Sequence, residues 1–162
     1  MQTIQDVPML LRREIEALML KPFLDAFSEE FGRERTLEIA ARVVSEIAEA
    51  GGEAYAKKLG ANDLPAISQQ VKDWGAGDAL KTRPLSEEAA SSCDYGFDVT
   101  ECAYAKMYER IGMKELGTLL SCGRDEPFYK GFNPKIRFDR TKTLMEGCGC
   151  CDFRFCMKKK EG

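Results

Sequence analysis

The spacing of apolar residues near the start of the chain constrains the fold more than any other feature. Apolar side chains recur there every three or four residues with charged residues between them, which is the period of an amphipathic helix. This first stripe consists of Leu11, Ile15, Leu18, Met19, Phe23, Phe27 and Phe31. A second stripe with similar spacing consists of Ile39, Val43, Val44 and Ile47. The chain up to about residue 80 is therefore predicted to be helical.

Glycine and proline indicate where these helices begin and end. Gly32 predicts the end of the first helix, and the pair Gly51-Gly52 predicts an end or a kink in the second. A third helix is predicted to begin near Asp63, with Pro65 in its first turn, and to run toward residue 74.

The pattern changes after residue 80, where short strands and short helices follow each other. Residues 79–99 predict two strands around a polar turn, and residues 100–112, 114–122 and 126–132 predict short helices. Residues 135–145 and 151–157 predict two further strands. Helices followed by a small, mostly antiparallel sheet with inserted helices favour an α+β fold. We expect one domain over residues 1–162, helical to about residue 80 and mixed over about 81–157.

The charge and the apolar content exclude several classes of protein. The formal net charge is −3 and the basic residues are scattered, whereas nucleic-acid-binding proteins concentrate Lys and Arg in one footprint. No apolar stretch approaches the ~20 residues that a membrane span needs, and charged residues at positions 12, 13, 14 and 16 interrupt the first apolar segment. We therefore expect a cytoplasmic protein that binds neither nucleic acid nor membrane.

The chain has seven cysteines and no histidine. Structural disulfides are rare in the cytoplasm, so these cysteines are expected to be free thiols, metal ligands or reactive groups. Without histidine, the usual Ser–His and Cys–His catalytic pairs are excluded. A structural zinc site normally needs a second pair of ligands, and the cysteines before residue 148 stand alone at irregular spacing.

The last predicted strand, "CDFRFCM", has two faces because successive side chains of a strand alternate. One face is expected to be core and consists of Cys151, Phe153, Phe155 and Met157. The other face suits solvent or a polar cleft and consists of Cys150, Asp152, Arg154 and Cys156. Cys150 and Cys151 therefore cannot easily bind one metal ion while both stay in the strand.

Cys102 lies at the start of the helix predicted over residues 100–112, near a possible cap at Asp98 or Thr100. Backbone N–H groups at a helix start would lower the pKa of its thiol. The alternative is a small buried residue that packs against the first turn. Cys102 and Cys150 are the candidate metal ligands, with zinc as the candidate metal.

Cys122 lies between two helical segments, beside Gly123, Arg124 and Asp125. Arg124 could hold a carboxylate through two hydrogen bonds, or stabilise a thiolate by its charge. Asp125 could orient a water molecule or cap the helix that follows it.

Four short motifs in the second half of the chain carry a family resemblance: "LSCGRD", "GFNP", "RTKT" and "CDFRF", in that order. With them, the stretch from Phe97 to Phe155 resembles the L-2-amino-thiazoline-4-carboxylic acid hydrolase family. The resemblance implies a hydrolase that acts on a C–N bond of a small cyclic amidine and opens the ring to N-carbamoyl-cysteine. It also implies a fold similar to the vinyl-reductase and TRAPP ligand-binding domains. Members of that family commonly carry histidine before "CDFR", where this chain has Cys150.

Under this enzyme hypothesis, water or a thiolate of Cys122 or Cys151 attacks the amidine carbon. Asp125 or Asp152 accepts a proton, and Arg124 holds the carboxylate of the small-molecule substrate.

Asn133 and Tyr104 are further candidates for contact with the substrate. Asn133 could instead be a turn residue before Pro134, and Tyr104 could be a core residue of its helix. Two alternatives to an enzyme also stay open. One is a non-catalytic sensor or accessory module that binds a small molecule or a metal. The other is a purely structural domain that forms a homo-oligomer.

Overall fold

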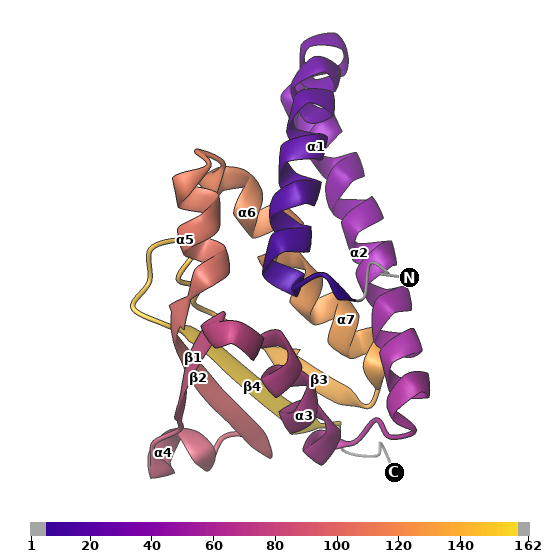
Figure 1. Cartoon of the computed structure of the whole chain (residues 1–162). Coiled ribbons are helices and arrows are strands. Elements are labelled where there is room, and N and C mark those ends of the chain that lie inside the picture. The colour runs from indigo at the N-terminus through magenta and orange to yellow at the C-terminus, as the bar shows by residue number, and fades with distance from the viewer. Residues whose placement is uncertain (1–5, 159–162) are drawn as a thin grey trace.

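The computed structural model describes residues 6–158, in which long helices precede a four-stranded sheet (Figure 1). The helices of the first part are α1 (Met9–Phe31), α2 (Arg33–Leu59) and α3 (Leu64–Trp74), followed by the 3-10 turn η2 (Ala76–Asp78). The second part contains β1 (Leu80–Pro84), α4 (Glu87–Ala90), β2 (Tyr95–Cys102), α5 (Ala103–Arg110), α6 (Lys114–Leu120), η3 (Cys122–Arg124), α7 (Asp125–Phe132), β3 (Ile136–Asp139) and β4 (Cys151–Met157). The predicted α+β class is confirmed.

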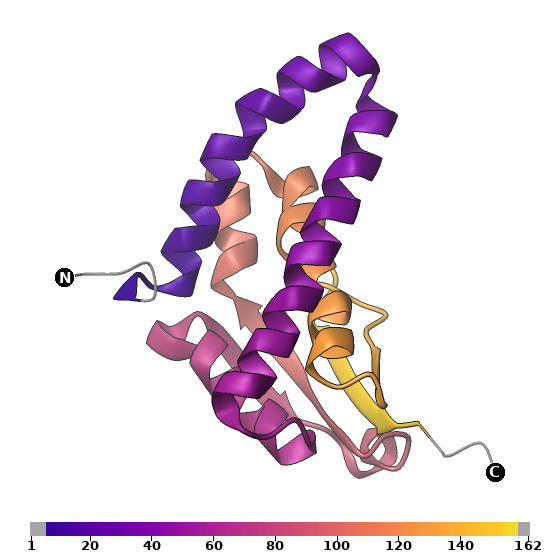
Figure 2. The same ribbon diagram turned by 90° about the vertical axis from the view of Figure 1, so that its right-hand side faces the viewer.

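α1 and α2 form a hairpin whose tip extends beyond the rest of the molecule (Figures 1 and 2). Gly32 forms the turn, as predicted: its φ of 84° favours glycine, and its N–H donates to the carbonyl of Ser28 at 3.0 Å. The start of α3 is also confirmed, because the carboxylate of Asp63 accepts a hydrogen bond from the N–H of Ala66 at 3.0 Å.

The Gly51-Gly52 pair does not end the second helix, because α2 continues to Leu59. Gly52 is buried where α2 crosses α7, and a Cβ atom there would lie 2.0 Å from the carbonyl oxygen of Phe128. From the other side, a Cβ atom on Gly131 would lie 2.0 Å from the carbonyl oxygen of Glu49. These two glycines let the helix backbones approach closely.

The sheet is antiparallel with strand order β1-β2-β4-β3. One face packs against α3 and α7 through Ile67, Tyr129 and Phe132. The Tyr129 ring meets the Phe155 ring edge-on at 4.7 Å between centroids, which joins α7 to β4. This packing fixes β4, the strand with the two predicted faces, beneath α7.

Alternation along β4 is confirmed for three of its four predicted core residues. Cys151, Phe153 and Phe155 are buried, and the residues between them are half-buried. Met157 was also predicted to be core, but it is 43% exposed. It is the last residue of β4 and lies opposite Ile136 at the start of β3, so it sits at the end of the sheet.

A second core joins α1 and α2 to α5 and α6, with Ala17 and Leu24 as the buried residues of α1. The first apolar stripe forms a helix as predicted, but its residues point away from this core. All seven residues of the stripe are 47–64% exposed. In the second stripe Val44 is buried, whereas Ile39, Val43 and Ile47 are exposed.

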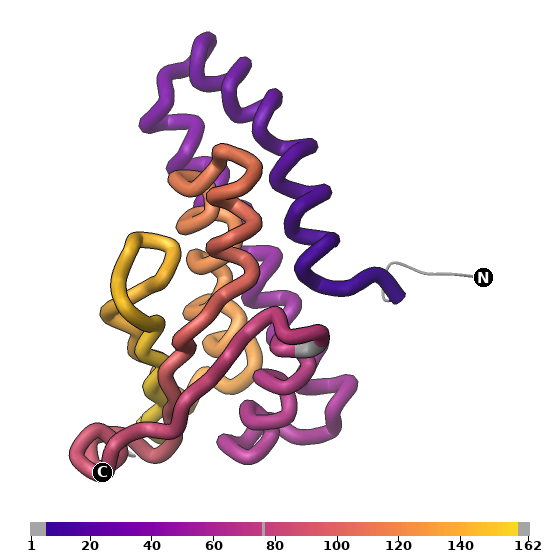
Figure 3. Tube along the Cα trace, turned by 60° about the vertical axis from the view of Figure 1, so that its left-hand side comes forward, coloured from indigo at the N-terminus to yellow at the C-terminus, as the bar shows by residue number. Residues whose placement is uncertain are grey.

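Residues 140–150 connect β3 to β4 without a helix or a strand and form a loop beside α5 (Figure 3). The carboxylate of Asp152 fixes the start of this loop by accepting hydrogen bonds from Thr141 and Lys142. Within residues 6–158, no helix combines the length and the apolar character that crossing a membrane requires.

Candidate functional site

An ion pair between Asp125 and Arg140 lies in the interior where η3, α7 and β3 meet. The two side chains are only 15% and 14% exposed, and Arg140 also donates to the carbonyl of Cys122 at 3.2 Å. The guanidinium carbon lies 5.9 and 5.7 Å from the ring centroids of Phe138 and Phe153. The Nε of Arg140 is buried and has no hydrogen-bond partner among residues 6–158.

Burial raises the pKa of Asp125 to about 6, although the charge of Arg140 and its hydrogen bond act in the opposite direction. The N-cap of α7 is Arg124, Asp125 is the first helical residue, and its carboxylate accepts a hydrogen bond from Arg140. The interpretation of Asp125 as a helix cap is therefore wrong: Arg140 occupies its carboxylate instead. The carboxyl is poised to exchange a proton near neutral pH, which is the property that a general base needs.

Three thiols lie near this ion pair: Cys102, Cys122 and Cys151. They are close enough that the charge of Asp125 raises the pKa of each, after burial, which is the main cause. The pKa of Cys122 is raised to about 12 and that of Cys151 to about 11. The thiols are thus protonated at neutral pH. We call these five residues, Cys102, Cys122, Asp125, Arg140 and Cys151, the interior cluster.

The structure corrects the expectation that the pKa of Cys102 is lowered. Cys102 is itself the N-cap of α5, and its sulfur accepts a hydrogen bond from the N–H of Ala105 at 3.5 Å. This bond favours the thiolate, but burial outweighs it and the pKa is raised. Asp98 and Thr100, the expected caps, lie within β2.

The described part of the chain offers no third donor for the metal site predicted at Cys102 and Cys150. Among residues 6–158, no group of three or more Cys, Asp or Glu side chains is placed to hold one metal ion. Cys102 belongs to the interior cluster, and Cys150 lies half-buried in the loop before β4. The neutral thiols of the cluster also differ from the thiolates that zinc prefers.

The other predicted site residues are held by different partners. The Nε of Arg124 donates to the carbonyl of Leu120 at 2.7 Å, and its Nη2 lies 3.4 Å from Glu16 of α1, away from the interior cluster. In Asp152, burial is outweighed by the hydrogen bonds from Thr141 and Lys142, which lower its pKa.

Asn133 and Tyr104 have structural partners as well. The side chain of Asn133 donates to the carbonyl of Asn62 at 2.7 Å and accepts from the N–H of Lys135 at 2.9 Å, as a turn residue does. Tyr104 is buried, and its hydroxyl lies 3.5 Å from the carbonyl of Trp74. Asn133 therefore has the partners of a turn residue, and Tyr104 those of a core residue.

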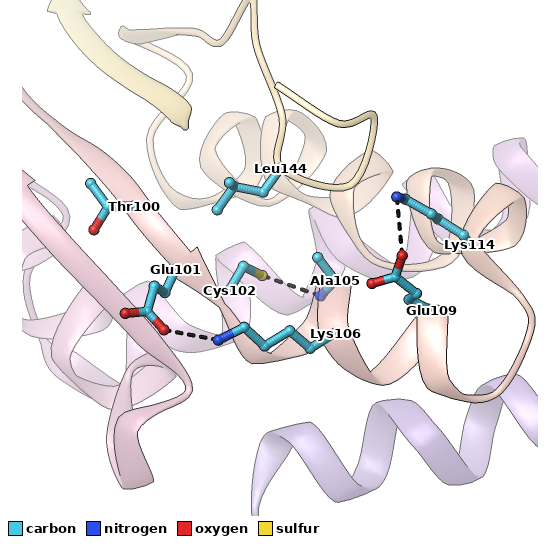
Figure 4. Close-up of a pocket in the computed structure, with 8 residues that line it drawn as sticks. All are labelled: Thr100, Glu101, Cys102, Ala105, Lys106, Glu109, Lys114 and Leu144. Carbon is cyan, nitrogen blue, oxygen red and sulfur yellow. Dashed lines mark hydrogen bonds and ion pairs between the residues drawn. The ribbon is translucent and has the colours of Figure 1, made fainter. Parts of the chain in front are cut away.

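A pocket of about 170 Å³ opens at the start of α5 (Figure 4). Two ion pairs lie in it: Lys106 with Glu101 at 2.8 Å, and Lys114 with Glu109 at 3.6 Å. Hydrogen bonds and charge from Lys106 and Lys81 lower the pKa of Glu101 to about 2, so it is ionised at neutral pH. The pocket therefore presents fixed charges of both signs to a small ligand.

Cys102 and Leu144 connect the pocket to the interior cluster. Both side chains line the pocket, and the backbone N–H of Leu144 donates to the sulfur of Cys151 at 3.2 Å. Leu144 belongs to the loop 140–150, so the part of this loop that contacts the cluster also forms a wall of the pocket.

Sequence reasoning named Cys102, Cys122, Asp125 and Cys151 but missed Arg140 and the charges of the pocket. Arg140 is in the quoted motif "RTKT", but nothing in its spacing indicates that it pairs with Asp125 across fifteen residues. The pocket lysines lie on short amphipathic helices, where charged residues are ordinarily exposed.

A family model described as "L-2-amino-thiazoline-4-carboxylic acid hydrolase" matches residues 12–155, which include the whole interior cluster and the pocket. No curated protein matches the chain. No solved structure matches it either.

Proposed function

The chain belongs to the L-2-amino-thiazoline-4-carboxylic acid hydrolase family, and we propose that it opens the ring of a small cyclic amidine that carries a carboxylate. The observation that carries this proposal is the buried Asp125–Arg140 ion pair, which belongs to the interior cluster that Cys102 and Leu144 connect to the pocket. Taking two charges out of water costs free energy, whereas burying a well-packed apolar pair carries no such cost. A perturbed carboxyl retained at such a cost, next to a pocket, is typical of a functional site.

The pocket has the charges that such a substrate needs. Lys106 and Lys114 can bind the substrate carboxylate, and the ionised Glu101 can bind a protonated amidine. The volume of about 170 Å³ is below the range of drug-sized ligand sites and suits a single small ring. In this pose the substrate lies against Cys102 and Leu144.

Water, rather than a thiolate, attacks the amidine carbon, because the pKa values of Cys122 and Cys151 keep both thiols protonated. Asp125 accepts the proton of the attacking water, and because its side chain does not line the pocket, the transfer runs through an intervening water or thiol. Arg140 holds the carboxylate in place, and its unpaired Nε can donate a hydrogen bond to the negative charge that develops.

Atom balance then identifies the bond that breaks. The tetrahedral carbon expels the ring sulfur, which takes a proton back from Asp125 and leaves as a free thiol. N-carbamoyl-cysteine keeps both nitrogens on this carbon, so its formation breaks a carbon–sulfur bond, not the carbon–nitrogen bond expected at first. Breaking the ring carbon–nitrogen bond would instead give S-carbamoyl-cysteine, which has no free thiol.

The test is to incubate the purified protein with excess 2-amino-thiazoline-4-carboxylate. Product mass is followed by mass spectrometry, and free thiol by a chromogenic disulfide reagent after subtraction of the protein's own thiols. We expect one thiol for each product molecule. We expect Asp125→Asn to lower kcat by about 10²–10⁴-fold and Lys106→Met mainly to raise KM.

A matched control is Lys81→Met, because Lys81 also pairs with Glu101 but does not line the pocket. It should change KM much less than Lys106→Met. Absence of any product would refute the proposed reaction. If calorimetry still detected saturable binding of the substrate, the non-catalytic binding module would become the better interpretation.

A further inference from the structure

The α1–α2 hairpin carries large apolar side chains that no other element of residues 6–158 covers. Eight of them belong to α1: Leu11, Ile15, Leu18, Met19, Leu20, Phe23, Phe27 and Phe31. Three belong to α2: Ile39, Val43 and Ile47. All eleven are 37–64% exposed. We call this set the hairpin face.

The hairpin face has the geometry of a helix-packing surface. Six of its residues, from Leu11 to Phe31, are spaced four apart and form one ridge of α1, and the three residues of α2 form a second ridge of the same kind. Such ridges fit into the grooves of another helix. Along the α1 ridge the rings of Phe27 and Phe31 lie 6.2 Å apart.

The two ridges also lie at matching heights on the hairpin. Phe23 is nine residues before Gly32 and Val43 is eleven residues after it, so their distances from the turn differ by about 3 Å at the rise of an α-helix. The same offset holds for Phe27 with Ile39 and for Met19 with Ile47. In Figure 2 the two helices meet only at the turn and diverge below it, so a partner helix can lie across both.

We propose that two copies of this chain associate through the hairpin face. With roughly 150–250 Å² for a large aromatic side chain and less for an aliphatic one, the half-exposed set amounts to on the order of 1,000 Å². The largest apolar patch of a typical monomer is about 300–600 Å². A stable interface needs about 800 Å² from each partner. The summed apolar area of the two ridges is therefore comparable with what each partner of a dimer buries.

A second copy fits this surface better than a charged partner does. The charges beside the ridges include three pairs within their own helices: Lys21–Asp25, Arg35–Glu38 and Arg42–Glu46. These paired side chains offer no excess of one sign to select an oppositely charged protein or an anionic surface. An identical apolar face also meets itself across a two-fold axis without needing any complementary surface.

The fold of α1 gives a second reason. Only Ala17 and Leu24 of its 23 residues are buried, so the core holds this helix weakly. A partner that covers the outer side of α1 must be present whenever the chain is folded. A second copy of the same chain meets this requirement.

The experiment measures the mass of the full chain in solution by light scattering and sedimentation across a dilution series. We expect twice the chain mass of 18.2 kDa. The double change Phe23→Glu and Phe27→Glu should weaken the dimer by at least ~100-fold, since each residue would be a central apolar contact. The control Met157→Glu adds one charge at a similarly exposed apolar residue outside the hairpin face and should leave the dimer intact.

A photo-crosslinking amino acid with a benzophenone side chain at position 27 tests the same contact without adding charge. Irradiation should give a covalent dimer whose crosslinked peptide comes from α1 or α2 of the other copy. A monomer at every concentration would overturn the proposal, as would a dimer that the double change does not weaken. Crosslinks to another part of the chain, or a monomer that binds phosphatidylcholine vesicles through this face, would overturn it too.

Discussion

The Asp125–Arg140 pair leads to a prediction about stability that runs against the usual expectation for a salt bridge. Burial raises the pKa of Asp125 from 3.8 to about 6, so the folded protein holds this proton more tightly than the unfolded chain does. The free energy of unfolding should therefore fall as the pH rises from about 4 to about 6 and level off above that range. At about 1.36 kcal/mol for each pKa unit, the loss amounts to about 3 kcal/mol.

Asp125→Asn should therefore make the protein more stable at pH 7.5, by up to about 3 kcal/mol. Asparagine keeps a carbonyl oxygen that can accept from Arg140 but carries no charge to bury. Well below pH 3.8 the two proteins should converge, because Asp125 is then neutral in both the folded and the unfolded state. The same variant should lose most of its activity, so a loss of turnover could not be attributed to unfolding.

Urea unfolding followed by circular dichroism at several pH values between 4 and 8 measures this difference. Glu46→Gln serves as the control, because it breaks the exposed pair with Arg42 and should change stability by less than about 0.5 kcal/mol at any pH. A variant Asp125→Asn that is several kcal/mol less stable at pH 7.5 would refute the reasoning. It would mean that attraction within the pair outweighs the cost of burying it.

Three further predictions concern the packing, the thiols and the loop. Gly52→Ala should destabilise the protein by about 3 kcal/mol, because the added Cβ would collide with the backbone of α7. Gly51→Ala has no atom within 4 Å of its added Cβ and should stabilise the protein by about 0.5–1 kcal/mol. Equal effects of the two changes in urea unfolding would contradict the close crossing of α2 and α7. In the folded protein at pH 7, Cys122 and Cys151 should resist alkylation by iodoacetamide, whereas in the unfolded protein at higher pH both should react, as peptide mapping would reveal. Rapid labelling of the native protein would contradict the raised pKa values of the two thiols. Asp152→Ala should increase hydrogen exchange of the backbone amides in residues 141–150, because it removes three hydrogen bonds to this loop. Unchanged exchange would mean that other contacts hold the loop.

The sequence predicted the features that local chemistry determines. Gly32 ends α1 and Asp63 caps α3, because a positive φ and a cap each involve residues within one turn of the helix. The alternation of β4 was predictable for the same reason, up to Met157, whose exposure depends on where the sheet ends.

The features that failed depend on residues far away in the chain. Gly52 was interpreted as a helix end, yet its role is set by α7, more than seventy residues later. The pKa of Cys102 was expected to fall because of the helix start, but burial, which only the tertiary structure determines, raises it. Asp125 was interpreted as a ligand of water or as a helix cap, whereas the structure pairs it with Arg140, fifteen residues later. Short-range patterns carry no information about such pairings.

The proposed active site and the proposed dimer interface both involve α1. Its inner side contacts α5, the helix that begins at the pocket, and Glu14 pairs there with Arg110 at 2.7 Å. If a second copy covers the outer side of α1, association also holds α1 against α5 and so supports the pocket. We therefore expect specific activity to fall on dilution over the same concentration range in which the dimer dissociates. The double change Phe23→Glu and Phe27→Glu should lower activity at every concentration while circular dichroism stays unchanged. Activity that stays constant across the dissociation range would mean that α5 keeps its position without the partner, because the second core alone then fixes α1.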